Sequence, residues 1–490
     1  MNKPLRRIAI FCGLLVLALL IRTNWLQYVQ ADSLATDKDN RRVAIERYAT
    51  PRGDIIVDGK AITGSSASEG LDYKYKRTWK NGEMWAPVTG YSSQIIGATQ
   101  LESLEDGILT GNDDRLFFRN TLDMVTGKKK EGGSVVTTLN AAAQKAAFEG
   151  LGDKKGAVVA LDPKTGAILA LASTPSYDPS TFAGISTKDS KAFQKLDKDA
   201  DKPMLNRALR ETYPPGSTFK VVTAAAALEN DIVSGIDDKT KTPDPYQLPG
   251  GTKTDLTNEH GVCKNATLRY ALMVSCNTVF AKMSDNVGNE KMREQAEKFG
   301  FNESELDVPV RAAESVYPED NQPQNALDGI GQASNRTTPL QMAMVASAVA
   351  NDGELMKPYM VDQLRASNLD VIETHDPETL SQPVSAETAQ KLQDMMETVV
   401  NDPQGTGGKA KIGGDITVGG KTGTAQHGVN NKGKPYAWFI SYAKLSDGTS
   451  PVAVAVVVED GAAERGDISG GGLAAPIAKS VMQAVINSKK

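Results

Sequence analysis

The chain has 490 residues, a formal net charge of −5, 40% hydrophobic residues and 23% charged residues. This length allows two or three domains, and the composition is that of a folded protein. The slight acidity gives no hint of nucleic-acid binding. The three cysteines lack a C-x-x-C spacing and the three histidines are scattered, so we expect no metal and no other cofactor.

An apolar run near the N-terminus predicts a membrane anchor. Residues 8–21 are uninterrupted by charge, and basic side chains precede them. The run is shorter than the roughly 20 residues that span a bilayer. Arg22, however, can extend to the interface, where Trp25 and Tyr28 resemble an aromatic belt. The sequence therefore predicts a transmembrane signal anchor at residues 8–28.

Positive charge before the anchor predicts that residues 1–7 are cytoplasmic and that the bulk of the chain is extracytoplasmic. A cleaved signal peptide is the alternative, but the small residues at 29–31 lie about ten residues beyond the apolar run. Either way, a disulfide between Cys263 and Cys276 is permitted, with free buried thiols as the alternative.

Residues 29–150 are expected to form a mixed, non-catalytic module. A turn, a short strand and another turn occupy residues 50–59. A strand over residues 133–139 precedes a helix from residue 141 to about 151, with Asn140 as its N-cap. No nucleophile-and-base pair stands out here, so we interpret the module as one that binds or positions.

Residues 151–490 are expected to form one domain in which strands come first and last. The early strands, 156–162 and 167–172, are nearly continuous in apolar residues, which predicts helices on both faces of their sheet. Three more are expected near the C-terminus, at residues 416–424, 437–444 and 452–459. A last helix then has Pro476 in its first turn.

The region between these strands is expected to be mostly helical. One helix has Thr338 as N-cap, Pro339 at its first position and Gln341 at the capping-box position. Ser385 caps another. The economical arrangement is one sheet made from both ends of the domain, with the helical part packed beside it.

The segment at residues 213–229 contains the first candidate catalytic pair. Two prolines and a glycine precede a helix expected to start at Ser217, with Lys220 on the same face. The helix dipole would favour a serine alkoxide, and the apolar residues after Lys220 would lower its pKa. An ordinary capped helix with a surface lysine is the alternative, because S-x-x-K is common by chance.

Two further clusters carry polar side chains at short spacing. Ser275 and Asn277 follow an apolar helical run, although a polar turn explains them equally well. Gly419-Gly-Lys-Thr-Gly-Thr-Ala425 combines glycines, which allow close approach to a strand, with a cation and hydroxyls. A phosphate-binding loop is disfavoured, because that motif needs glycine where this chain has Asp415, and a helix where a strand is expected here.

S-x-x-K, S-x-N and K-T-G occur in the order found in β-lactamases and penicillin-binding proteins. The chain resembles the class B penicillin-binding proteins, the D,D-transpeptidases of peptidoglycan synthesis, and is most similar to their short actinobacterial A type. The resemblance extends along most of the chain, through residues 52–59, 89–102, 156–178 and 329–341.

This resemblance implies an α+β fold. The transpeptidase domain, similar to serine β-lactamases, would have an antiparallel sheet flanked by helices and an all-helical subdomain. An elongated mixed N-terminal domain, of a dimerisation or pedestal type, and one transmembrane helix would precede it.

The resemblance also implies a role for each motif residue. Ser217 would attack the penultimate D-Ala carbonyl of a stem peptide, and neutral Lys220 would take its proton. Ser275 could relay that proton to the leaving D-Ala, while Asn277 orients Lys220 and the substrate amide.

The K-T-G strand would bind the substrate. Lys421 would supply positive potential, and Thr422, Gly423 and Thr424 would hold the terminal carboxylate. The backbone amides of Ser217 and Thr424 would form the oxyanion hole. β-Lactams would acylate the same serine.

The expected partners are peptidoglycan stem peptides, β-lactams, a separate membrane glycosyltransferase of the shape, elongation, division and sporulation type, and divisome proteins. A D,D-carboxypeptidase, a serine β-lactamase and a non-catalytic β-lactam sensor or division scaffold are the alternatives. A bifunctional class A enzyme would need a glycosyltransferase domain, for which the segment before residue 151 is too short. The choice between division and elongation stays open.

Overall fold

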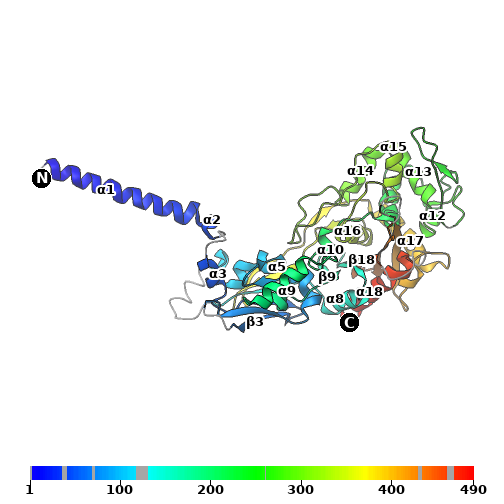
Figure 1. The fold of residues 1–490 in the computed structure, drawn as a ribbon. Coiled ribbons are helices and arrows are strands. Elements are labelled where there is room, and N and C mark those ends of the chain that lie inside the picture. Colours follow the sequence, from blue (N-terminus) through cyan, green and yellow to red (C-terminus); the bar gives the residue numbers. More distant parts are fainter. Residues whose placement is uncertain are drawn as a thin grey trace.

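The computed structural model describes residues 3–35, 41–68, 72–116, 131–259, 261–426, 428, 433–460 and 468–489. A helix projects from one end, a mixed module follows it, and a larger body lies farthest from the N-terminus (Figure 1). The candidate site belongs to the larger body.

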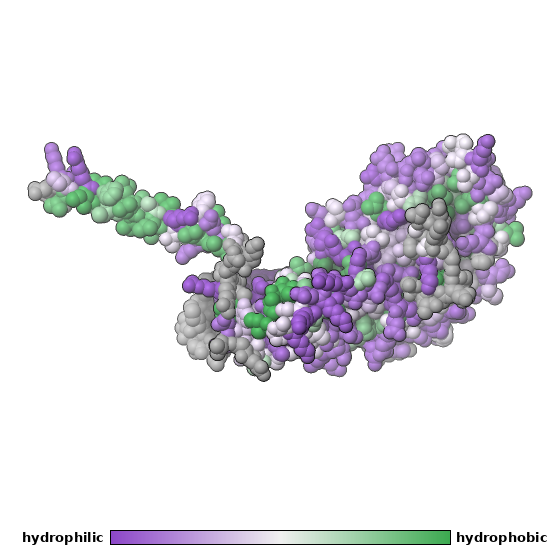
Figure 2. Space-filling view, viewed as in Figure 1, coloured by the Kyte–Doolittle hydropathy of each residue, from purple (hydrophilic) through white to green (hydrophobic). Residues whose placement is uncertain are grey.

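The projecting helix is α1, Lys3–Asn24, which continues as the π-helix Trp25–Val29. It is long and apolar enough to cross a membrane, and none of its residues is buried in the protein. Its surface is apolar along most of its length and polar at its start (Figure 2). A helix satisfies its own backbone hydrogen bonds, as a lipid-exposed segment must. The predicted anchor at residues 8–28 lies within this helix.

The mixed module is built on a five-stranded sheet with the order β14-β13-β7-β1-β2. Its strands are β1 (Ile55–Val57), β2 (Lys60–Ala61), β7 (Ser134–Thr137), β13 (Val361–Arg365) and β14 (Val371–Thr374). β1 and β7 are parallel, and β13 is antiparallel to β7. A hairpin from late in the chain thus completes a sheet begun before residue 150, which the division at that residue did not anticipate.

Short elements surround this sheet. They are α2 (Ala31–Ala35), α3 (Arg41–Arg47), β3 (Thr63–Ala67), β4 (Tyr75–Trp79), α4 (Gly82–Thr89), β5 (Ser92–Ser93), β6 (Gly97–Ala98), α5 (Gln100–Leu104) and α6 (Asp106–Thr110). The sequence pattern did not predict the helices before residue 50.

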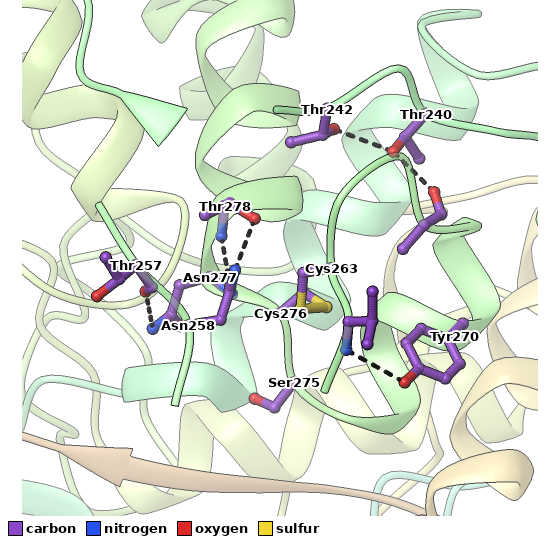
Figure 3. Close-up of a disulfide and its surroundings, with 12 residues drawn as sticks. Thr240, Thr242, Thr257, Asn258, Cys263, Tyr270, Ser275, Cys276, Asn277 and Thr278 are labelled. Carbon is purple, nitrogen blue, oxygen red and sulfur yellow. Dashed lines mark hydrogen bonds between the residues drawn. A yellow bond between two sulfur atoms is a disulfide. The ribbon is translucent and has the colours of Figure 1, made fainter. Parts of the chain in front are cut away.

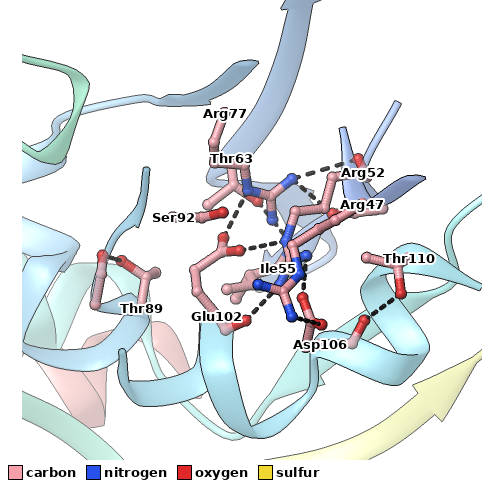
Figure 4. Close-up of polar contacts among 12 residues, drawn as sticks. Arg47, Arg52, Ile55, Thr63, Arg77, Thr89, Ser92, Glu102, Asp106 and Thr110 are labelled. Carbon is pink, nitrogen blue, oxygen red and sulfur yellow. Dashed lines mark hydrogen bonds and ion pairs between the residues drawn. The ribbon is translucent and has the colours of Figure 1, made fainter. Parts of the chain in front are cut away.

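A buried ion cluster joins these elements (Figure 4). The carboxylate of Glu102 accepts from Nε of Arg52 and from Nε of Arg77, each at 2.6 Å, and all three side chains are buried. Buried charges are tolerated only when they are paired and hydrogen-bonded. The segment before β1, strand β4 and helix α5 are therefore held in one geometry.

The larger body has an antiparallel five-stranded sheet with the order β16-β17-β18-β8-β9. The strands are β8 (Lys155–Leu161), β9 (Ile168–Thr174), β16 (Thr417–Ala425), β17 (Tyr436–Lys444) and β18 (Val452–Asp460). β18 pairs with β8, so both ends of the domain form one sheet, as predicted. β16 lies at the edge.

Helices cover both faces of this sheet. α8 (Ala141–Leu151) and α18 (Ala475–Ser488) pack on one face with Val158 and Ala160. α11 (Lys220–Glu229), α16 (Pro339–Ala350) and α17 (Ala386–Asn401) belong to the core on the other face, with Val159 and Leu161. This two-sided burial explains why β8 and β9 are nearly continuous in apolar residues, as expected.

The helical part lies at the end of the body distant from α1 (Figure 1). It contains α12 (Leu268–Met273), α13 (Asn277–Val287), α14 (Asn289–Lys298) and α15 (Gln322–Asp328). It is not all-helical, because β10 (Tyr246–Gln247) pairs with β11 (Asp255–Leu256). The remaining elements are α9 (Thr187–Asp197), α10 (Arg207–Arg210), β12 (Leu355–Met356) and β15 (Thr379–Ser381).

The predicted N-caps are present, but the predicted capping box is wrong. Asn140, Thr338 and Ser385 each accept a hydrogen bond from the backbone of their own helix. The side chain of Gln341, however, donates to the carbonyl of Phe299 and does not return to Thr338. Because α16 is buried, its polar side chains bond to the packed neighbours instead of its own first turn.

Candidate active site

The turn that carries Ser217 is fixed by hydrogen bonds on both sides. The helix expected from residue 217 begins as the 3-10 turn Gly216–Phe219 and continues as α11. The carbonyl of Pro214 accepts from Nε1 of Trp438 at 3.1 Å, and the amide of Gly216 donates to the carbonyl of Gly331 at 2.9 Å. Ser217 itself is half-buried, so its hydroxyl is accessible from a rigid support.

Gly331 packs directly against Gly216 of this turn. Its φ of +74° is in the left-handed region, and a Cβ added there would meet the Gly216 carbonyl oxygen at 2.0 Å. Nearby, Tyr213 and Thr337 exchange both backbone hydrogen bonds, at 2.9 and 2.8 Å. Residues 329–341 are part of the resemblance described above. This segment therefore supports the turn that contains Ser217 through backbone contacts.

Lys220 is completely buried and its amine is held by the S-x-N segment. Nζ donates to the carbonyl of Ser275 at 2.8 Å and to Oδ1 of Asn277 at 2.7 Å, and it lies 3.2 Å from Oγ of Ser275. Burial lowers the pKa of Lys220 well below its ordinary value, and the nearby charge of Lys421 lowers it further. The arrangement favours a neutral amine that can accept a proton.

Ser217 and Lys220, which were predicted to share a helix face, are not hydrogen-bonded to each other. Among the described residues, the polar partners of Lys220 Nζ are Ser275 and Asn277. Spacing along the helix puts the two side chains on one face, but the fully buried amine turns to the carbonyl and amide oxygens that satisfy it. Hydrogen bonds to a catalytic base are commonly long without substrate.

Ser275 lies between the two lysines. Its Oγ is 2.9 Å from Nζ of Lys421 and 3.2 Å from Nζ of Lys220, and the side chain is half-buried. It stands just beyond the end of α12 with a φ of +65°, a conformation that non-glycine residues seldom adopt. One hydroxyl is thus in reach of both amines, and local strain marks the position as unusual.

Lys421 projects from the edge strand β16 towards Ser275 and is fully buried. Burial lowers the pKa of Lys421 to about 7. The expected fixed positive charge is therefore only partly present at neutral pH without substrate. A bound carboxylate would raise the pKa and restore the charge.

Gly423 allows β16 and the nucleophile turn to touch. A Cβ at Gly423 would meet Cγ2 of Thr218 at 3.0 Å and the carbonyl oxygen of Pro215 at 3.1 Å. Gly216 approaches Thr424 in the same way, since a Cβ there would meet the Thr424 carbonyl oxygen at 3.1 Å. The nucleophile turn is therefore in close contact with β16 at Gly423 and Thr424.

The hydroxyl of Thr422 has a partner that the sequence did not predict. Its Oγ1 lies 2.6 Å from Oγ1 of Thr406, which follows α17. Thr424 is half-buried two residues farther along the same strand, and alternation places its side chain on the same face as that of Thr422. Nothing in the local sequence distinguishes Thr406, because its proximity arises from packing between distant segments.

Cys263 and Cys276 form a disulfide beside the S-x-N segment (Figure 3). The sequence left the bridge and free thiols as alternatives, and the structure has the bridge. Because Cys276 stands between Ser275 and Asn277, the disulfide links the S-x-N segment to the loop that contains Cys263.

These groups fit a serine acyltransferase centre in which a lysine would be the base. A half-buried serine at a helix start, a buried amine with lowered pKa, a hydroxyl between two amines and a strand edge with threonine hydroxyls are the parts that acyl transfer requires. Within the described ranges, no group of three or more His, Cys, Asp and Glu side chains is placed to hold a metal ion.

Comparison with known proteins agrees with this class. The penicillin-binding protein transpeptidase domain matches residues 156–483, and the penicillin-binding protein A dimerisation domain matches residues 52–135. The chain is 39% identical to the peptidoglycan D,D-transpeptidase PbpA of Mycolicibacterium smegmatis, over 99% of each protein. It is 38% identical to PbpA of Mycobacterium tuberculosis, over 100% of each.

Solved structures give the same result. The ceftriaxone acyl-enzyme complex of penicillin-binding protein A from M. tuberculosis aligns with a TM-score of 0.85 and 37% identity, over 90% of this chain and 100% of that one. Its penicillin G acyl-enzyme complex aligns with a TM-score of 0.82. The chain belongs to the class B penicillin-binding proteins, the peptidoglycan D,D-transpeptidases.

Proposed function

We propose that this protein cross-links peptidoglycan stem peptides through an acyl-enzyme on Ser217, with release of D-Ala. The observation that carries the proposal is the position of Ser275, whose hydroxyl is within 3.2 Å of Lys220 Nζ and 2.9 Å of Lys421 Nζ, beside the Ser217 turn. Such a hydroxyl can move a proton between a base and a leaving group.

Acylation starts with attack of Ser217 Oγ on the carbonyl carbon of the penultimate D-Ala. Neutral Lys220 accepts the serine proton, and the new C–O bond gives a tetrahedral intermediate. The C–N bond to the terminal D-Ala then breaks, and the proton passes through Ser275 to the leaving amine. Asn277 keeps Lys220 oriented during both steps.

The edge of β16 binds the substrate during these steps. Thr422 and Thr424 donate to the terminal carboxylate, with Gly423 between them, and Lys421 supplies the positive charge. The backbone amides of Ser217 and Thr424 donate to the oxyanion, where fixed donors stabilise the developing charge most. Thr406 supports this subsite through its contact with Thr422.

Deacylation completes the cross-link. The amine of a second stem peptide attacks the ester carbonyl, the C–O bond to Ser217 breaks, and the serine recovers a proton. A β-lactam acylates the same Oγ, but its leaving group stays attached to the acyl chain, so no product leaves.

The anchor determines where this chemistry takes place. The apolar helix α1 supports attachment to the membrane, and basic residues before it support a cytoplasmic N-terminus with the catalytic body outside. Because residues 52–135, ahead of the transpeptidase domain, match the penicillin-binding protein A dimerisation domain, we infer a separate membrane glycosyltransferase of the shape, elongation, division and sporulation family, and divisome proteins, as partners.

A carboxypeptidase would transfer the acyl group to water, and a β-lactamase would hydrolyse penicillin. The experiment that separates them supplies a peptide ending in D-Ala-D-Ala together with an amine acceptor, and follows D-Ala release and the acyl product by mass spectrometry. Transpeptidation predicts an amide with the acceptor. Release of D-Ala with only the hydrolysed peptide would indicate a carboxypeptidase, and rapid turnover of penicillin would indicate a β-lactamase.

A further inference from the structure

Helix α13 is not capped by the side chain of its own N-cap residue. α13 begins at Asn277, and the residue before it, Cys276, makes no side-chain cap hydrogen bond. Its sulfur is joined to Cys263. The first amides of a helix have no partner within the helix, so another group must satisfy them.

Asn258 supplies that group from a different segment (Figure 3). Its Oδ1 accepts from the backbone amide of Asn277 at 2.7 Å and from that of Thr278 at 3.1 Å. Its Nδ2 donates to Oγ1 of Thr278 at 3.1 Å. An amide side chain can accept two hydrogen bonds and donate at the same time, whereas an ionised carboxylate can only accept.

Thr257, the residue before Asn258, orients the side chain of Asn277. Nδ2 of Asn277 donates to the carbonyl of Thr257 at 3.4 Å, while Oδ1 of Asn277 accepts from Lys220 Nζ at 2.7 Å. Thr257 and Asn258 therefore hold both the backbone and the amide plane of Asn277. The oxygen end of that amide is presented to Lys220.

The segment that contains Asn258 is fixed at both ends. β11, which ends at Leu256, pairs with β10, and the disulfide fixes Cys263 beside Cys276. The chain from residue 258 to residue 263 thus joins the S-x-N segment at two points, Asn258 and the disulfide. Glu259 lies in the same segment, and its charge acts on Lys220.

We propose that Asn258 is a positioning residue for acyl transfer, which caps α13 from outside the helix and thereby holds Asn277 against Lys220. The proposal rests on the acylation of Ser217 proposed above. Asn258 touches neither the nucleophile nor the base, and acts through Asn277. A displacement of about 1 Å at such a position can lower a rate about a hundredfold.

The test measures the second-order rate constant for acylation by a fluorescent penicillin, from pH 5.5 to 9, in the full-length protein. Asn258→Ala should lower this constant by about ten- to a hundredfold at every pH. Asn258→Asp keeps the two accepted hydrogen bonds and should restore most of the rate. Its added negative charge favours the protonated form of Lys220, so half-maximal acylation should move to higher pH.

Asn140→Ala is the matched control. Asn140 also accepts a backbone amide at a helix start, at 2.9 Å from Ala143 N, but on the opposite face of the sheet. Its loss should lower the melting temperature and leave acylation unchanged. If Asn258→Ala folds poorly, the result for Asn258→Asp tests the proposal instead. The expected shift of half-maximal acylation to higher pH in that variant does not arise from a change in stability.

Wild-type rates in Asn258→Ala would overturn the proposal. So would a pH profile in Asn258→Asp identical to that of the wild type. Labelling that persists in Ser217→Ala is a different failure, which would overturn the proposed function itself.

Discussion

The Oγ atom of Ser275 lies 2.9 Å from the Nζ atom of Lys421, a residue 146 positions away in the sequence. The same Oγ lies 3.2 Å from Lys220 Nζ. Two buried amines at one hydroxyl cannot both keep a full positive charge, because each raises the cost of charging the other. The site is thus constructed to keep one amine neutral.

The acylation rate should therefore depend on pH with a maximum near neutrality. The rate rises as Lys220 loses its proton, since the base must be neutral and its pKa is lowered by burial and by Lys421. It falls as Lys421, whose pKa is about 7, loses the charge that attracts the substrate carboxylate. The measurement is the second-order acylation constant against pH.

Two variants separate the rise of the acylation rate at low pH from its decline at high pH. Lys421→Arg keeps its charge to high pH and should remove the alkaline decline. Lys220→Arg cannot accept a proton and should lose at least about a hundredfold in rate at every pH. An alkaline decline that persists in Lys421→Arg would show that another group causes it.

Gly331→Ala should disrupt the nucleophile turn. A Cβ there would lie 2.0 Å from the Gly216 carbonyl oxygen, at a φ of +74°. Strain and overpacking together should reduce the free energy of unfolding by more than about 3 kcal/mol and reduce penicillin labelling. Gly251→Ala is the control, because φ is +76° there but nothing lies within 4 Å.

Gly251→Ala should cost only the backbone strain, about 1–2 kcal/mol, and keep full labelling. Thermal unfolding and labelling of both variants check this. Equal melting temperatures for the two variants would show that the contact between Gly331 and Gly216 does not support the turn.

Asp328 should make stability fall as pH rises. Its Oδ1 accepts from the amides of Ser334 and Asn335, but its buried Oδ2 has no hydrogen-bond partner among the described residues. Burial raises the pKa of Asp328 to about 7. The unfolded carboxyl ionises near pH 4, so the stabilising contribution is complete below that pH and is lost as pH rises to about 7.

The loss amounts to at most about 4 kcal/mol, from about three pKa units. Asp328→Asn carries no titrating group, so relative to the wild type it should be more stable at pH 8 than at pH 5. Thermal unfolding at both pH values provides the comparison. A constant difference between the two proteins would exclude a raised pKa at Asp328.

Glu102→Gln should weaken the N-terminal module. The change removes the carboxylate that Arg52 and Arg77 share. Arg52 keeps its ion pair with Asp106, but the buried guanidinium group of Arg77 loses its close carboxylate, at a cost of about 3–5 kcal/mol. The exposed pair of Lys145 and Glu149 is the comparison, and Glu149→Gln should cost less than about 1 kcal/mol. Similar unfolding free energies for the two variants would contradict the role of the cluster.

The catalytic motifs could be located in the sequence because each is short and its residues act close together. The strands of the large sheet were also predictable, since β8 and β9 are nearly continuous in apolar residues. The helix caps were predictable because they are local patterns. These features depend on neighbours within a few residues. They needed no knowledge of how distant segments pack.

Features that depend on distant segments could not be predicted. The hairpin β13–β14 joins β7 across more than two hundred residues, and Thr406 meets Thr422 only through packing of α17 against β16. Asn258 caps a helix that does not contain it. The spacing of Ser217 and Lys220 predicted a shared face, but not that Ser275 and Asn277 would take the bonds of the amine.

The central claim is that Ser217 is the nucleophile of a transpeptidase site. The most direct measurement labels the full-length protein and Ser217→Ala with a fluorescent penicillin, and identifies the modified peptide by mass spectrometry. We expect a stable covalent adduct on the peptide that contains Ser217, and no adduct in Ser217→Ala. Labelling of equal intensity in Ser217→Ala, or an adduct on another residue, would contradict it.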